Sequence, residues 1–184
     1  TFIREGITHI FGGLDHILFV ICLVVAVRSL RELAIVITSF TLAHSITLIL
    51  VALGLIDLSP RIVEPIIALS IMYVAIENIV RDKPKHRQVL TFTFGLVHGL
   101  GFGGALRELA LSSKDTAALL FGFNVGVELG QLLVVAPVFP LIWWLHRPRA
   151  GASERESRHR GVTIGVCAVA TLVASIWFVE RLLS

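Results

Sequence analysis

Apolar residues along the chain gather in six long stretches separated by shorter polar connections. A helix needs about 20 predominantly apolar residues to cross the hydrocarbon core of a bilayer, and each stretch has about this length. The stretches predict membrane-spanning helices at roughly 6–27, 33–54, 62–81, 88–106, 117–145 and 162–182. We therefore expect an all-α polytopic membrane protein in which residues 1–184 form a single six-helix bundle.

Polar side chains inside five of these stretches recur at three- and four-residue steps, which places them on one face of each helix. In the first stretch His9 and His16 are seven residues apart, so on one continuous helix they lie on the same face. Such groups are costly in contact with lipid, and we expect them to face the interior of the bundle. The sixth stretch has only mildly polar residues, which predicts a packing helix.

Depth along the helices decides which of these groups can meet. At a rise of about 1.5 Å per residue, the histidines at 16, 44 and 98 and the acid at 128 fall near the midpoints of their stretches. His9 lies toward one side of the membrane and Glu77 toward the other, so the predicted site is elongated. It contains four histidines and three acids: His9, Asp15, His16, His44, Glu77, His98 and Glu128.

Imidazole and carboxylate groups form a ligand set for divalent zinc, nickel or cobalt, and no inward thiolate cluster favours a softer metal. Polar neighbours are expected to orient these ligands by hydrogen bonds: Thr41, Ser45, Asn78, Asn124 and Gln131. A proton relay of histidine and glutamate uses the same residues, and so does a purely structural hydrogen-bonded core. A metal-dependent intramembrane hydrolase with Glu77 or Glu128 as general base is a further alternative.

Composition agrees with a membrane protein, because 55% of the residues are hydrophobic and the mean hydropathy is +0.86. Eleven of the 16 Lys and Arg residues fall in the first, third and fifth connections, so the positive-inside rule predicts both termini outside. These short clusters report topology rather than a nucleic-acid partner, which we do not expect. The two cysteines, Cys22 and Cys167, lie in apolar stretches and are expected to be packing residues. The expected environment is the lipid bilayer, and the sequence does not decide whether the protein forms a homo-oligomer.

Five separated motifs carry a family resemblance. They are the His-x5-Asp-His block at 9–16, FTLAHSITL at 40–48, Ser70-Ile71 followed by AIEN at 75–78, FGLVHGLGF at 94–102 and FNVGVELGQ at 123–131. Together they resemble the HupE/UreJ family of bacterial membrane proteins, which is associated with hydrogenase and urease gene clusters. The resemblance implies a nickel or cobalt permease of the bacterial inner membrane. It also implies that His9, Asp15 and His16 handle the metal.

We therefore expect binding and permeation of a divalent transition metal, with nickel or cobalt first and zinc as a further possibility. In this hypothesis the ion enters from the outer side near His9, loses water to imidazole and carboxylate groups, and leaves toward Glu77. Acid should weaken uptake, because protonated imidazoles cannot bind a metal. The runner-up function is the metal-dependent enzyme, acting on a lipid or a membrane peptide.

Overall fold

The computed structural model describes residues 2–27, 29–81, 86–102, 115–145 and 152–183, and only the backbone of residues 145 and 152–159. Within these ranges the chain forms seven α-helices and no strand, which confirms the all-α class. The helices are α1 (Phe2–Gly12), α2 (Leu14–Ala26), α3 (Leu30–Ala52), α4 (Pro60–Val80), α5 (Arg87–Leu100), α7 (Thr116–Leu145) and α8 (Ala152–Leu183).

The first predicted span is a bent pair of short helices, because α1 and α2 meet at 76° around Gly13. The Gly13 N–H donates to the His9 carbonyl at 3.0 Å, and the Gly13 carbonyl accepts from the His16 N–H at 3.0 Å. A Cβ at position 13 would lie 2.6 Å from His16 Nδ1, so glycine leaves the space that this imidazole fills. The prediction of one continuous helix over 6–27 is therefore wrong. His9 and His16 meet across a corner and do not stack along one helix face.

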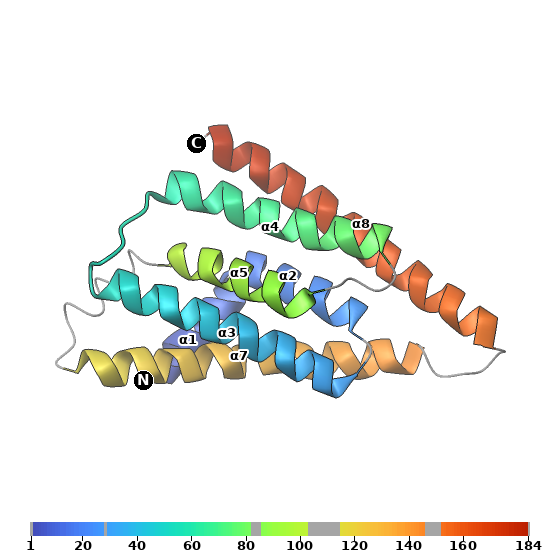
Figure 1. Ribbon diagram of the computed structural model, residues 1–184, viewed down its shortest axis with the longest axis horizontal. Coiled ribbons are helices and arrows are strands. Elements are labelled where there is room, and N and C mark those ends of the chain that lie inside the picture. The colour runs from blue at the N-terminus through green and yellow to red at the C-terminus, as the bar shows by residue number, and fades with distance from the viewer. Residues whose placement is uncertain (1, 28, 82–85, 103–114, 146–151, 184) are drawn as a thin grey trace.

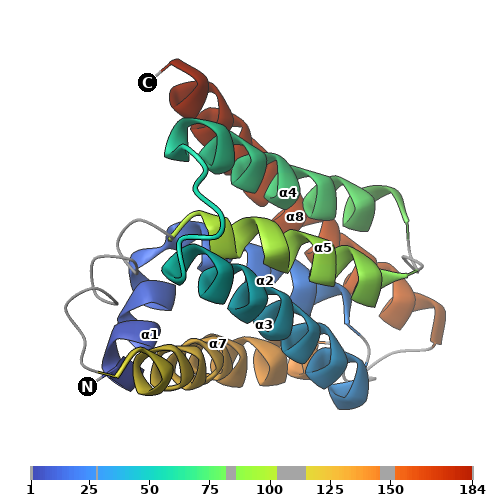
Figure 2. The same cartoon turned by 60° about the vertical axis from the view of Figure 1, so that its left-hand side comes forward.

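The central element is α2, which contacts α1, α3, α4, α7 and α8. Its Phe19, Cys22 and Leu23 side chains are buried in the apolar core. Around it stand three closely packed pairs, α3 with α5, α4 with α8, and α1 with α7 (Figures 1 and 2). In Figure 1, α4 and α8 lie above this core and α7 lies below it. The start of α2 consequently delivers His16 to the interior of the bundle.

Glycine allows α1 and α7 to approach until their backbones touch. A Cβ at Gly126 would lie 2.9 Å from the Gly6 Cα and would also collide with the Ile3 carbonyl. One turn further along, Gly130 faces the Ile10 side chain. Small residues of this kind let helices pack closely in lipid, where the hydrophobic effect does not drive association. The contact places α1 along α7 and carries His9 toward the other histidines.

Four described helices are long and apolar enough to cross a membrane, and the bent pair of α1 and α2 passes the same test jointly. The four are Leu30–Ala52, Pro60–Val80, Thr116–Trp144 and Arg160–Leu183. The fourth predicted span, 88–106, corresponds to α5, a helix of 14 residues. Residues 103–106 of that span lie outside the described part of the chain. The helical bundle agrees with the prediction, whereas the count of six crossings stays a prediction.

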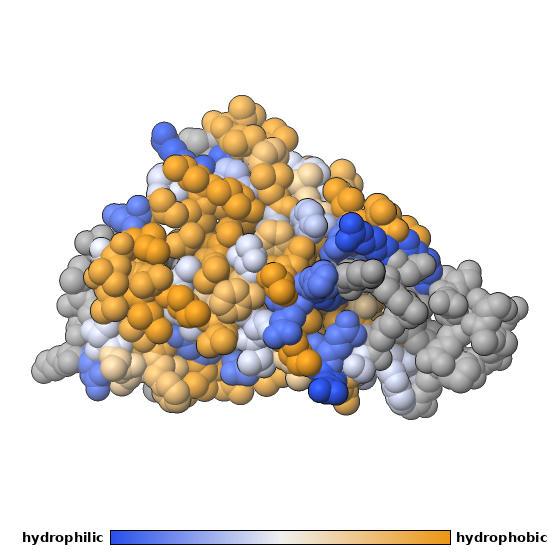
Figure 3. All heavy atoms as spheres, viewed as in Figure 1, coloured by the Kyte–Doolittle hydropathy of each residue, from blue (hydrophilic) through white to orange (hydrophobic). Residues whose placement is uncertain are grey.

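Apolar side chains also cover much of the molecular surface. Figure 3 shows hydrophobic residues over most of the described part of one face, with hydrophilic residues gathered toward the right-hand end. Leu42, Leu69 and Leu172 are among the large exposed apolar residues on membrane-length helices. A surface of this kind is stable in lipid and not in water, so the chain is an integral membrane protein. Both termini lie at the same end of the bundle, on the left in Figure 1.

Candidate metal centre

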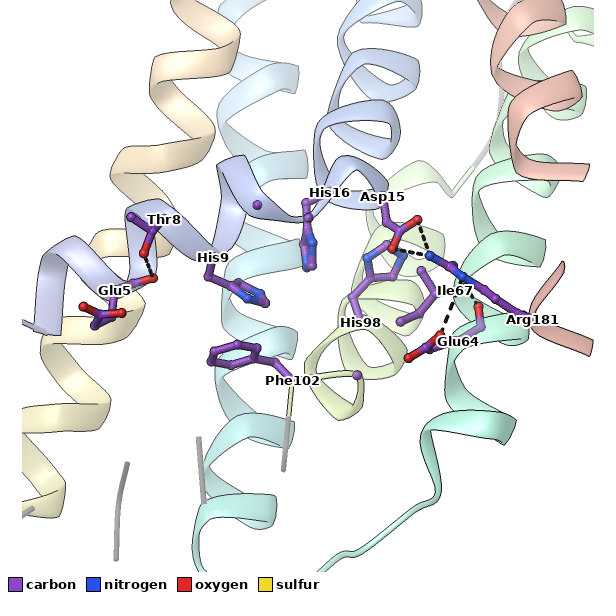
Figure 4. Close-up of a pocket in the computed structure, with 13 residues that line it drawn as sticks. Glu5, Thr8, His9, Asp15, His16, Glu64, Ile67, His98, Phe102 and Arg181 are labelled. Atoms are coloured by element: carbon purple, nitrogen blue, oxygen red, sulfur yellow. Dashed lines mark hydrogen bonds and ion pairs between the residues drawn. The ribbon is translucent and has the colours of Figure 1, made fainter. Parts of the chain in front are cut away.

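A pocket of about 450 Å³ opens where α2 and α4 begin and α5 and α8 end. We call this end of the bundle the pocket end. The pocket is lined by imidazole, carboxylate, guanidinium and small or apolar residues (Figure 4): Glu5, Thr8, His9, Gly12, Gly13, Asp15, His16, Glu64, Ile67, His98, Gly101, Phe102 and Arg181. Three of the four predicted histidines therefore line one cavity.

His9, His16 and His44 form a compact group, which we call the histidine group. Each offers one ring nitrogen, and the three nitrogens all lie within 4.8 Å of one another. The ring centroids of His9 and His16 are 4.6 Å apart, and that of His44 is 5.7 Å from His9 and 5.8 Å from His16. These spacings allow three nitrogens to close on a single ion at ordinary bond lengths of about 2.0–2.1 Å with small side-chain movements.

His16, His44 and the neighbouring His98 are buried and His9 is partly buried, and most of their ring nitrogens lack a hydrogen-bond partner within the described part of the chain. Among the described residues, the unpartnered buried nitrogens are Nε2 of His9, both nitrogens of His16, both of His44 and Nδ1 of His98. A buried polar atom without a partner costs about 1–3 kcal/mol, so native proteins seldom leave several together. A divalent cation would satisfy the lone pairs that converge here. The donor set therefore fits a borderline transition metal.

Aromatic side chains enclose the imidazoles. The His9 ring lies 4.1 Å from the Phe102 ring, which stacks on Phe123 at 5.2 Å. Phe40 stacks against His44 at a centroid distance of 5.8 Å. These rings restrict imidazole rotation and keep bulk water away from the nitrogens. The low dielectric that results strengthens any ion–ligand interaction inside the cluster.

Asp15 lies in the same pocket, but both of its carboxylate oxygens accept hydrogen bonds from the Arg181 guanidinium, at 2.9 and 3.0 Å. Arg181 also donates to the Glu64 backbone carbonyl at 3.2 Å and lies 3.7 Å from the Glu64 carboxylate. The predicted ligand Asp15 is thus close to the histidine group and engaged by an ion pair. Arg181 ties the end of α8 to the starts of α2 and α4.

Glu77 and Asn78 lie at the opposite end of the bundle and do not line the pocket. The Glu77 carboxylate pairs with Arg81 at 3.2 Å through Oε1, while Oε2 is buried and has no partner among the residues that the structure describes. Asn78 donates to the Cys22 carbonyl at 2.7 Å and accepts from the buried Arg87. These groups join α2, α4 and α5 to one another. Asn78 therefore bonds helices to one another at this end of the bundle, and the structure does not place it beside the histidine group that it is predicted to support.

Two pairs of polar side chains join α3 to α7. Thr41 donates to Gln131 at 2.8 Å, and Ser45 donates to Asn124 at 2.7 Å, so these predicted neighbours of the ligands stitch two helices together. Glu128 is exposed and does not line the pocket. The structure does not bring Glu128 to the histidine group, because α7 turns Gln131 and the flanking Val127 inward and Glu128 outward.

Sequence reasoning missed two residues at the centre of this region, Ser70 and Arg181, as functional neighbours. Ser70 lies 2.9 Å from His98 Nε2, yet in the sequence it is only part of a family motif that assigns it no role. Arg181 is a basic residue at the end of the last predicted span, and such a residue can pair with an acidic group in the bundle. That signal served only to orient the helices and named no partner.

These observations define a helical membrane protein with a buried cluster of imidazoles next to an open polar pocket. A family model described as "HupE / UreJ protein" matches residues 1–181, nearly the whole chain. The chain therefore belongs to the HupE/UreJ family. Comparison with curated proteins gives no significant match, and comparison with solved structures gives none either.

Proposed function

We propose that the protein binds a divalent transition-metal ion at the histidine group and carries it across the membrane. The observation that carries the proposal is the convergence of buried imidazole nitrogens that have no hydrogen-bond partner among the described residues. The association of the HupE/UreJ family with nickel and cobalt transport supports the choice of cargo. Nickel and cobalt are the preferred ions, and zinc is the third that the ligand type favours.

The neutral charge of the ligands suits a transport site. Three imidazoles supply electron pairs but no negative charge, so a bound divalent ion keeps its full charge in a low-dielectric interior. This limits the affinity, and a transported ion must be bound weakly enough to leave. A site completed by several carboxylates would hold the ion more tightly.

We propose that the pocket end faces the outside of the bacterial inner membrane. Four described basic residues, Arg31, Arg81, Arg87 and Arg160, lie toward the opposite end, where the positive-inside rule predicts the cytoplasm. Glu5 and Glu64 line the mouth of the pocket and attract cations toward His9. Release takes place at the opposite end, toward Glu77, where a polar network of Asn78 and Arg87 closes the bundle.

The hydrolase hypothesis gains no support from the geometry. Its two candidate general bases are Glu77, at the far end of α4, and Glu128, on the exposed face of α7. Neither lines the pocket beside the histidine group. A general base has to reach the attacking water directly or through one further water, which these positions do not provide.

Binding and uptake measurements test the proposal. Titration of the detergent-purified protein with Ni²⁺, Co²⁺ and Zn²⁺ should show one site, and the same ions should enter proteoliposomes. His16→Ala should weaken binding at least tenfold and abolish uptake. His86→Ala is the matched control, because His86 is exposed at the other end of the bundle and should leave both unchanged. Full binding and uptake by His16→Ala would overturn the proposal.

A further inference from the structure

Ser70 is buried beside His98, and its hydroxyl has two partners. Ser70 Oγ lies 2.7 Å from the Ile67 carbonyl, one turn earlier in α4, and 2.9 Å from His98 Nε2. Ser70 is 1% exposed and the His98 side chain has no exposure. Water therefore does not compete for either contact.

Counting protons fixes the direction of these hydrogen bonds. A serine hydroxyl has one proton and two acceptor lone pairs, whereas a carbonyl oxygen can only accept. If Ser70 donates to the Ile67 carbonyl and accepts from His98 Nε2–H, both contacts are hydrogen bonds. If Ser70 donates to His98 Nε2, the carbonyl contact is lost and Nδ1–H becomes a buried donor without a partner. The first arrangement is favoured, since it makes one more hydrogen bond and buries no orphaned donor.

In the favoured arrangement the proton of the neutral His98 ring is on Nε2, and Nδ1 carries a free lone pair. The His98 ring lines the pocket 5.3 Å from the His16 ring, and Figure 4 shows the two side by side. Phe19 at 4.8 Å and Phe40 at 5.3 Å limit its rotation. His98 is thus held as a ligand-ready imidazole next to the histidine group, although it is outside the set of three mutually close nitrogens.

We propose that His98 is a fourth ligand of the transported ion, bound through Nδ1, and that Ser70 is the positioning residue that selects this nitrogen. The inference rests on the proposed metal function and adds the ligand atom and the residue behind it. A hydrogen bond to the second nitrogen of a metal-binding histidine fixes its tautomer and raises its basicity. Ser70 gives His98 this support from α4, a helix that contributes no ligand itself.

Co²⁺ titration of detergent-purified full-length variants tests the role of Ser70. Ser70→Ala should lower the affinity about tenfold or more, because losing such a support costs about 10–100-fold. Ser70→Thr keeps the hydroxyl and should restore most of the affinity, together with the visible absorption of Co²⁺ in a four-nitrogen site. Ser175→Ala is the control, since Ser175 makes a similar bond to its own helix without touching an imidazole. Wild-type affinity in either Ser70→Ala or His98→Ala would overturn the inference.

A measurement without metal separates this inference from the proposed function. Nitrogen NMR of ¹⁵N-histidine-labelled protein should show His98 protonated at Nε2 in the wild type, and His98→Gln identifies the signal. Ser70→Ala should redistribute the proton between the two nitrogens. A wild-type His98 protonated at Nδ1 overturns the inference even if Co²⁺ binds. A wild-type protein that binds no Co²⁺ but shows the expected tautomer overturns the proposed function and the ligand role of His98, and leaves only the assignment of the His98 proton by Ser70 standing.

Discussion

The His44 imidazole has no exposure to solvent, and neither of its nitrogens has a hydrogen-bond partner among the described residues. A histidine kept only for packing would normally bond at least one nitrogen. The sequence identified this residue because an intramembrane imidazole is rare and expensive. It could not exclude Glu128 by the same reasoning, since a shift of one residue on a helix turns a side chain by about 100°.

At the scale of single residues, metal binding should depend on pH. Each imidazole of the histidine group binds a metal only in its unprotonated form, so protons compete with the ion. Ni²⁺ affinity measured by titration between pH 7.5 and pH 5 should fall as the pH falls. His86→Ala should give the same profile as the wild type. A constant affinity over this range would mean that imidazoles are not the ligands.

The ion pair of Asp15 and Arg181 should contribute to stability. Both side chains are about one-fifth exposed, at 19% and 21%, so the pair lies between a surface and a buried salt bridge. A double-mutant cycle of Asp15→Asn and Arg181→Gln should give a coupling of about 1–3 kcal/mol in the free energy of unfolding. The measurement is an SDS unfolding titration in micelles. Additive effects of the two changes would show that the contact contributes nothing.

At the scale of helices, the apolar stretches predicted the positions of α3, α4 and α7 well, because length and hydropathy decide membrane insertion. They could not predict the bend between α1 and α2. In the sequence, a glycine that marks a bend, such as Gly13, cannot be told from one that packs two helices together, because the same residue type also lets helices approach closely. Only the space that His16 needs beside Gly13 distinguishes the two uses.

The glycine contact between α1 and α7 should not tolerate a side chain. Gly126→Leu places atoms where the Ile3 carbonyl and Gly6 already lie, so the helices must separate. We expect the free energy of unfolding to fall by about 2–3 kcal/mol, and metal binding to weaken because His9 moves with α1. Gly165→Leu is the control, because nothing lies within 4 Å of a Cβ there. Equal stability of the two variants would contradict the packing argument.

At the scale of the whole molecule, the sequence predicted one all-helical membrane bundle, and the structure agrees. The proximity of His16, His44 and His98 agrees with their common depth along the predicted helices, whereas His9 joins them because the chain bends by 76° between α1 and α2. The pairing of helices did not follow, because any apolar helix can pack on any other in lipid. For that reason the sequence predicts that Thr41 and Ser45 orient metal ligands, whereas in the structure they bond α3 to α7.

The orientation of the bundle is testable by labelling. With the two natural cysteines buried, a thiol reagent that cannot cross membranes should report only added cysteines. Ser59→Cys at the pocket end should be labelled in intact spheroplasts, whereas Gln88→Cys at the opposite end should react only after lysis. Both positions are exposed, so accessibility of the site itself is matched. The reverse pattern would place the pocket in the cytoplasm.

The corner at Gly13 has a mechanical consequence. His9 lies on α1 and His16 on α2, so a rotation of one helix relative to the other about Gly13 changes the distance between the two imidazoles without unwinding a helical turn. A cation bound by both imidazoles would fix the angle between α1 and α2, and a change of that angle would release the ion. Spin labels on α1 and α2 should then show a narrower distribution of distances when Ni²⁺ is added. An unchanged distribution would mean that the angle at Gly13 is fixed without a bound metal.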